Sequence, residues 1–155
     1  MRPLLLTTLV ASLALANAAA QEKIDPKKEL EQFQGTWIPA KFDVPADKKL
    51  PEGFLEKARF VFKGDKLVTM FEGKNVDEAT FKLDPTKKPK WFDVSPSGGP
   101  NKGKTSEGIY EFDEDTLKIC MGAPGQKRPT EFKVVTEAGS KTALMVLKRE
   151  KPSCK

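Results

Sequence analysis

The chain has 155 residues, and its 27 lysines and arginines outnumber its 22 aspartates and glutamates to give a formal net charge of +5. It contains no histidine, which excludes a Ser-His-Asp triad, a Cys-His pair and metal sites with histidine ligands. Its two cysteines alone are too few for a structural zinc site. We therefore expect a non-enzymatic protein that uses no cofactor and no metal ion.

The first 20 residues are typical of an export signal. Arg2 supplies the positive charge, and an apolar run over residues 4–16 follows it. Ala18 and Ala20 are the small residues that a signal peptidase reads. The apolar run is shorter than the roughly 20 residues that span a bilayer, which argues against a membrane anchor. We expect cleavage after Ala20, a periplasmic or extracellular mature chain of formal charge +4 once Arg2 is lost, and no transmembrane segment in it.

A polar lead-in, residues 21–29, precedes the first regular element of the expected fold. The stretch from Pro26 to Gln34 has helical composition and predicts a short N-terminal helix. A second short helix is expected further along, with Pro51 as its first residue and with Phe54 and Leu55 buried.

Most of the remaining chain reads as short strands, in which apolar and polar residues alternate between turn signals roughly every 8–12 residues. The expected strands are residues 36–44, 58–63, 66–71, 78–83, 91–94, 107–112, 116–121, 131–136 and 142–149. A hairpin succession of about eight or nine strands predicts an all-β fold, a small antiparallel up-and-down barrel, because closure removes the exposed edges. The barrel domain is expected over residues 30–149, followed by a tail over residues 150–155.

The alternation also predicts which side chains point into the barrel. The inward set is Phe60, Phe62, Phe81, Phe92, Leu117, Ile119 and Val146. The aromatic candidates for an interior lining are Phe60, Phe62, Phe81, Phe92, Tyr110, Phe112 and Phe132. Two interpretations stay open for these aromatic residues: they line an apolar ligand cavity, or they fill a solid core.

A Gly-x-Trp sequence stands at the start of the first strand, as Gly35 and Trp37, and Arg149 stands on the last strand. A guanidinium stacks well on an indole face and still donates hydrogen bonds to nearby carbonyl oxygens. We expect Trp37 to be buried with Arg149 against its ring, and Gly35 to take a backbone conformation that is costly for other residues. This arrangement resembles the lipocalin pattern, in which the arginine covers the tryptophan at the closed end of a barrel.

Six further stretches carry a more specific resemblance. They are LEQFQGTW at 30–37, FKGDK at 62–66, TFKLDPTKKPK at 80–90, GPNKGKT at 99–105, GIYEFDEDTLKIC at 108–120 and RPTEF at 128–132. Together they resemble the planctomycete-type uncharacterised domain, a family of lipocalin-like barrels, from about Leu30 to Arg149. The resemblance implies export, a small β-barrel and a bacterial envelope or extracellular setting. It implies no activity and no site residue, because the family has none assigned.

Lysines surround one tryptophan in the middle of the chain. The set is Lys82, Lys87, Lys88, Lys90, Trp91, Lys102 and Lys104. Such a patch fits an anionic partner, for example a polysaccharide or an acidic lipid headgroup, or else it is a solvated rim that aids solubility. We expect no nucleic-acid partner, because an exported protein seldom meets one.

The two cysteines suggest a disulfide, because an exported chain meets an oxidising compartment. Cys120 is expected on the outward face of its strand, and Cys154 lies on the C-terminal tail. A tail that runs back outside the barrel would bring the two thiols together. The alternative is an inert Cys120 and a free thiol on the tail.

Three functions follow from these observations. The first is an exported barrel that binds a small apolar or amphipathic ligand, or an envelope component, at its open end. The second is a solid-core interaction module that acts through lysine-rich loops on an anionic surface. The third is a carboxylate-only hydrolase, which needs two facing acids with separated pKa values in a cleft. The densest acidic cluster, Asp113 to Asp115, is expected on a turn, where such residues more often form local hydrogen bonds.

Overall fold

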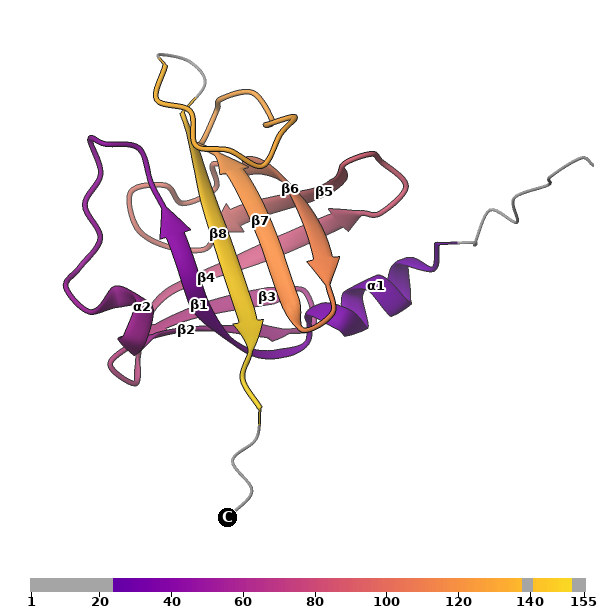
Figure 1. Ribbon diagram of the computed structural model, residues 1–155, viewed down its shortest axis with the longest axis horizontal. Coiled ribbons are helices and arrows are strands. Elements are labelled where there is room, and N and C mark those ends of the chain that lie inside the picture. Colours follow the sequence, from indigo (N-terminus) through magenta and orange to yellow (C-terminus); the bar gives the residue numbers. More distant parts are fainter. Residues whose placement is uncertain (1–23, 138–140, 152–155) are drawn as a thin grey trace, which may run out of the picture.

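The computed structural model describes residues 24–137 and 141–151, which form a closed barrel of eight antiparallel strands with a short helix at its start (Figure 1). The strands pair in chain order around the barrel, and β8 closes it by pairing with β1. This confirms the all-β up-and-down barrel. The expected export signal, residues 1–20, lies outside the described residues. The elements are α1 (Pro26–Phe33), β1 (Gly35–Asp43), α2 (Phe54–Lys57), β2 (Ala58–Lys63), β3 (Lys66–Phe71), β4 (Lys74–Asp84), β5 (Lys90–Pro96), β6 (Ser106–Asp113), β7 (Thr116–Gly122) and β8 (Thr142–Arg149).

Both helices begin at residues that suit a helix start. Asp25 caps α1, because its side chain accepts a hydrogen bond from the backbone N–H of Lys27 at 2.9 Å. The second helix begins after Gly53, whose φ of +70° is left-handed, and not at Pro51 as expected. It is therefore a single turn. Phe54 packs against the core, but Leu55 points away and is 40 % exposed, so the expected burial of Leu55 is wrong. In the described ranges, no helix is both long and apolar enough to cross a membrane.

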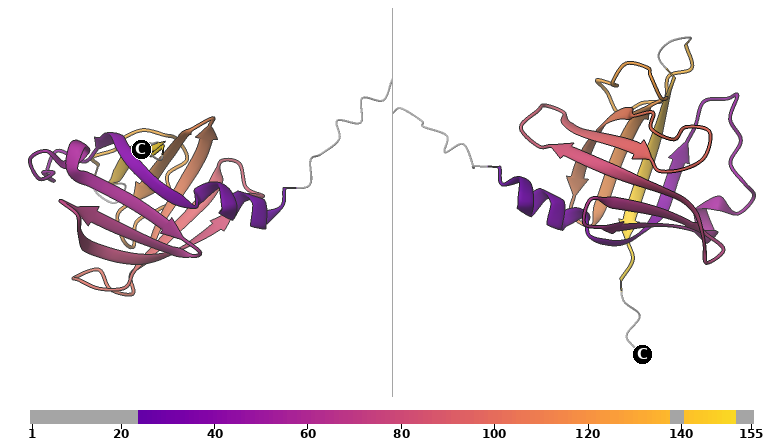
Figure 2. Two further views of the ribbon diagram at one scale, coloured as in Figure 1. Left: turned by 90° about the horizontal axis from the view of Figure 1, so that it is seen from below. Right: turned by 180° about the vertical axis from the view of Figure 1, so that it is seen from behind.

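The two ends of the barrel differ (Figure 2). At the end that we call closed, α1 lies beside the turns at residues 64–65, 85–89 and 114–115. The opposite, open end carries two long connections, residues 44–53 after β1 and 97–105 after β5. It also carries residues 123–137, here called the outer segment, which follow β7.

The outer segment is not the ninth strand that the sequence predicts over residues 131–136. Strand β7 pairs directly with β8 along its whole length, which leaves no gap for another strand between them. The segment runs outside the barrel instead, and the side chain of Thr142 is one of its attachments: the hydroxyl donates to the carbonyl oxygen of Lys133 at 2.7 Å and accepts from the N–H of Val135 at 2.8 Å. Phe132 consequently lies outside the barrel, beneath the Lys118 ammonium, and not in its interior.

In every strand for which the sequence predicts inward side chains, except β8, those side chains are buried in the structure. Phe60, Phe62, Phe81, Phe92, Leu117 and Ile119 are all buried. In β8, however, Met145 and Leu147 are buried, and Val146 is only half-buried. Met145 lies opposite Ile119 and Leu147 lies opposite Leu117, both inward on β7, so Val146 must face outward. The prediction for Val146 is therefore wrong by one position.

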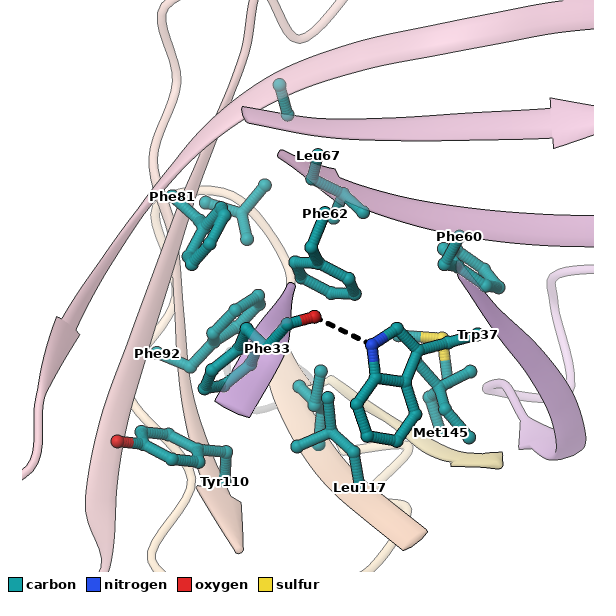
Figure 3. Packing of buried hydrophobic residues seen from close by; sticks show 14 residues of the cluster. Phe33, Trp37, Phe60, Phe62, Leu67, Phe81, Phe92, Tyr110, Leu117 and Met145 are labelled. Carbon is teal, nitrogen blue, oxygen red and sulfur yellow. Dashed lines mark hydrogen bonds between the residues drawn. The ribbon is translucent and has the colours of Figure 1, made fainter. Parts of the chain in front are cut away.

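A phenylalanine from α1 forms the centre of the core (Figure 3). The ring of Phe33 is fully buried, and five other rings lie with their centroids 5.0–5.6 Å from it. These neighbours are Phe62, Phe81, Phe92, Tyr110 and Phe112. The carbonyl oxygen of Phe33 accepts a hydrogen bond from the Trp37 indole N–H at 2.7 Å. The end of α1 therefore plugs the closed half of the barrel.

Candidate functional site

The closed end is sealed by the arginine and tryptophan that the sequence singles out. Strands β1 and β8 place Trp37 opposite Arg149, and the guanidinium carbon lies 4.3 Å from the centroid of the Trp37 ring system. The same guanidinium donates to the carbonyl oxygens of Gln34 at 2.7 Å and Gln32 at 2.5 Å. Gly35 has a φ of +113°, and a Cβ there would lie 3.4 Å from the Arg149 guanidinium. All three expectations for this motif are met, and its contacts are with the protein's own backbone and core.

A buried carboxylate fastens α1 to the barrel wall. Glu29 is only 7 % exposed, accepts a hydrogen bond from the Tyr110 hydroxyl at 3.0 Å and forms a salt bridge with Lys90. Burial and the Glu29 charge both raise the pKa of the Tyr110 hydroxyl above its usual value of 10.0. Tyr110 therefore stays protonated at neutral pH and serves as a hydrogen-bond donor. A phenol in this state is no general base, so this network holds the plug in place.

The aromatic residues proposed to line a cavity fill the closed half and the middle of the barrel. Phe62, Phe81, Phe92, Tyr110 and Phe112 surround Phe33 as described above, and Phe60 packs edge-on against Phe54 at 6.3 Å between ring centroids. Of the two interpretations left open by the sequence, the filled core describes these six side chains.

A cavity of about 430 Å³ lies at the open end. Its apolar walls come from the ends of four strands, through Phe42, Pro96, Met121 and Ala143. Its charged lining residues are Lys48, Lys49, Asp77 and Lys141. None of these residues was among the cavity residues named from the sequence. The alternation along β7, which points Leu117 and Ile119 inward, predicts Met121 in the same row, but no local signal places the connection from β1 over the mouth.

That connection, residues 44–50, forms a strap over the cavity and is fastened by one ion pair. The Lys141 ammonium lies 2.5 Å from the Asp47 carboxylate. The hydrogen bond from Lys141 holds the pKa of Asp47 below its ordinary value. Lys48 and Lys49 are exposed beside the mouth and enter no salt bridge within the described part of the chain. The strap therefore adds positive charge to the entrance.

The lysine-rich patch expected from the sequence is divided between the two ends. Lys87, Lys88, Lys90 and Trp91 lie at the closed end, whereas Lys102 and Lys104 lie in the connection between β5 and β6 at the open end. The physical reason is that consecutive turns of a meander fall at opposite ends of the strand between them. Lys90 is paired with Glu29, as described above.

Trp91 itself lies on the outside of the barrel between cations. The Lys87 ammonium lies 4.9 Å and the Arg128 guanidinium carbon 4.1 Å from its ring centroid. Arg128 also bonds to Asp93 at 2.5 Å and to the carbonyl oxygen of Gly108 at 2.6 Å. It thereby attaches the outer segment to the wall formed by β5 and β6.

Cys120 faces outward from β7, as expected, but the outer segment covers it completely. Its thiol donates to the carbonyl oxygen of Lys133 at 3.4 Å, and burial raises the pKa of that thiol. Cys154 lies outside the described residues, so the predicted disulfide between the two cysteines stays a prediction. Asp113, Glu114 and Asp115 form the end of β6, the turn and the approach to β7, and in the described ranges no group of three or more acidic or cysteine side chains is placed to hold a metal ion.

Comparisons of the chain with protein-family models, with curated proteins and with solved structures find no match. The resemblance to the planctomycete-type domain therefore stays a prediction from the sequence.

Proposed function

We propose that this protein is an exported, non-enzymatic barrel that binds a small amphipathic ligand in the open-end cavity. The observation that carries the proposal is the cavity of about 430 Å³, with apolar walls at Phe42, Met121 and Ala143. Ligand pockets in proteins usually measure roughly 300–1,000 Å³ and combine mostly apolar walls with a few polar groups. The open-end cavity has these properties.

The charges at the mouth suggest how the ligand lies. Lys48 and Lys49 are exposed at the entrance, and the ion pair with Asp47 neutralises Lys141. An anionic or strongly polar head at the strap and an apolar body against Met121 satisfy both parts of the lining. The plug formed by Phe33 limits the depth, so the ligand occupies only the open half of the barrel.

The compartment belongs to the same proposal. An N-terminal segment with the composition of an export signal suggests a ligand or partner of the bacterial envelope or the extracellular medium. Mass measurement of the protein from its own host tests this, because cleavage after Ala20 leaves a chain that begins at Gln21. Native mass spectrometry of the same material would detect a ligand that co-purifies.

A binding titration with an anionic amphipathic dye, anilinonaphthalene sulfonate, tests the site directly. Ala143→Phe places a ring in the cavity and should weaken dye binding about tenfold or more, whereas Lys49→Glu should weaken it several-fold by reversing charge at the mouth. Lys87→Glu makes the same charge change at the closed end and should leave the affinity unchanged. Equal affinity of the wild type and Ala143→Phe would refute binding in this cavity.

The filled closed half favours a second candidate, an interaction module that acts through its lysines. Lys87 and Lys88 are exposed at that end, and the core behind them is solid. Cosedimentation with vesicles of anionic or neutral lipid separates the two functions. Binding to anionic vesicles that is lost in Lys87→Glu/Lys88→Glu and kept in Ala143→Phe would support the second function.

A further inference from the structure

One strand of the barrel has an unpaired edge. Along residues 74–78, β4 pairs only with β3, for example Lys74 with Phe71 and Asp77 with Thr69. Its pairing with β5 begins at the next residue, where Ala79 lies opposite Pro96. We call residues 74–78 the free edge. An edge of this kind offers backbone donors and acceptors to another strand.

The side chains of the free edge are also available for contacts with another molecule. All five are exposed, including Val76, whose 58 % is the largest exposure among the large hydrophobic residues of the described chain. Within residues 24–137 and 141–151, no side-chain hydrogen bond or salt bridge involves Lys74, Asp77 or Glu78.

The chain leaves room beside this edge. After Pro96 it turns away from β4, and the N–H of Ser97 makes a last contact with the carbonyl oxygen of Glu78 at 2.8 Å. Beyond that contact, a hollow of about 520 Å³ separates residues 75–78 from residues 96–101. In Figure 2 the β3–β4 hairpin and the connection after β5 are seen apart from each other at this side of the barrel. An extended segment can therefore approach the free edge.

The order of charges along the free edge specifies what that segment is. Lys74 stands at one end, and Asp77 and Glu78 stand at the other. An antiparallel second copy of the same edge brings each lysine to the acidic end of the other copy, and two-fold symmetry makes this contact twice. Asp77 is the acid on the same face of the sheet as Lys74, because they lie opposite Thr69 and Phe71, two alternate residues of β3. Edges that are protected from pairing by charge commonly carry lysines, which repel each other when two copies approach. The free edge carries both signs, in the order that attracts an antiparallel copy.

We propose that two copies of the chain associate through β4, with residues 74–78 of each pairing antiparallel across a two-fold axis. The two barrels then share a continuous sheet, and the two Val76 side chains lie close to the axis. The bulge that β4 makes against β3 between Asn75 and Asp77 shortens the regular part of this pairing. An interface of five residues on each side is small, so the dimer is transient and depends on protein concentration.

Charge reversal tests the proposal. Sedimentation velocity of the wild type, from micromolar to about millimolar protein, should show a monomer–dimer equilibrium. Lys74→Glu should raise the dimer dissociation constant about tenfold, because two symmetry-related attractive contacts become repulsive. The variant Lys74→Glu/Asp77→Lys/Glu78→Lys exchanges the signs and should restore the wild-type constant to within about threefold. Lys82→Glu is the matched control, because Lys82 is exposed on the part of β4 that pairs with β5.

The outcomes that overturn the proposal are equally definite. A wild type that stays monomeric at millimolar concentration would refute it, as would a dimer that Lys74→Glu and Lys82→Glu weaken equally. If the triple variant Lys74→Glu/Asp77→Lys/Glu78→Lys dimerises more weakly than Lys74→Glu, these charges do not face each other. Amide chemical shifts on dilution provide a second measurement, in which residues 74–78 should move together.

Discussion

The plug formed by α1 makes a quantitative prediction for Phe33→Ala. The ring is fully buried and touches five aromatic neighbours, all held by strands of a closed barrel. Removing a buried phenylalanine ring costs about 3–5 kcal/mol, and the cost is highest where the surroundings cannot collapse into the void. Because the barrel wall is closed by eight hydrogen-bonded pairings, we expect about 4–5 kcal/mol for Phe33→Ala and about 1–2 kcal/mol for Phe33→Leu.

Urea unfolding of the protein, followed by tryptophan fluorescence, measures this loss. The midpoint should fall while the dependence of the unfolding free energy on urea stays unchanged, since the surface exposed on unfolding is nearly the same. Leu55→Ala is a control on the other helix, where the side chain is 40 % exposed, and should change stability by less than about 0.5 kcal/mol. A loss below about 1 kcal/mol for Phe33→Ala would show that the helix does not fill the barrel in solution.

Three further predictions concern single residues of the wall and the plug. Arg149→Ala should cost about 2–3 kcal/mol in urea unfolding, because it removes the stacking on Trp37 and two charged hydrogen bonds. Arg149→Lys should recover only part of this loss, and full recovery by lysine would contradict the stacking geometry. Gly108→Ala should cost about 1–3 kcal/mol, since its Cβ would lie 2.7 Å from the Cys120 carbonyl oxygen, whereas Gly98→Ala meets nothing within 4 Å and should be neutral. Tyr110 is the only tyrosine, so ultraviolet absorbance of phenolate reports its titration alone. Its pKa is raised in the folded chain, so the unfolded chain releases the proton first; stability should be intact below about pH 10 and fall above it. Tyr110→Phe should lose that dependence, and a phenol that titrates normally in the folded protein would contradict its burial.

The strand pattern predicts the inward residues where apolar and polar residues alternate, and fails where they do not. Strands β2 and β7 alternate, and their inward residues agree with the sequence. Residues 143–147 of β8 are five consecutive apolar residues, so the sequence there contains no signal for one face over the other. Only the pairing with β7 decides the register, and it buries Met145 and Leu147. Residues 131–136 show the opposite error, because a strand-like composition is used in an irregular segment held by the side chain of Thr142.

The strand pattern alone could not predict whether side chains fill the barrel interior or leave a cavity. The sequence leaves a choice between a cavity and a solid core for Phe62, Phe81 and Phe92, because their own volumes do not decide it. The residue that decides it, Phe33, comes from the helix, which the alternation of the strands does not include. The division of the lysine patch, in contrast, follows from topology alone. In an up-and-down meander, the turn before β5 and the connection after it must lie at opposite ends.

The open-end cavity and the free edge of β4 share part of their lining, so the two proposals are physically linked. Asp77, Pro96 and Asn101 border both hollows. A second copy at the free edge changes the surroundings of Asp77, which also lines the open-end cavity. If the ligand binds monomer and dimer with different affinity, it must shift the dimer constant by the same factor per site, because linkage is reciprocal. Dye affinity should therefore differ below and above the dimer dissociation constant in the wild type and stay constant in Lys74→Glu. Identical dye affinities at both protein concentrations would show that the shared residues do not couple dye binding to dimerisation, and the two sites would then be independent.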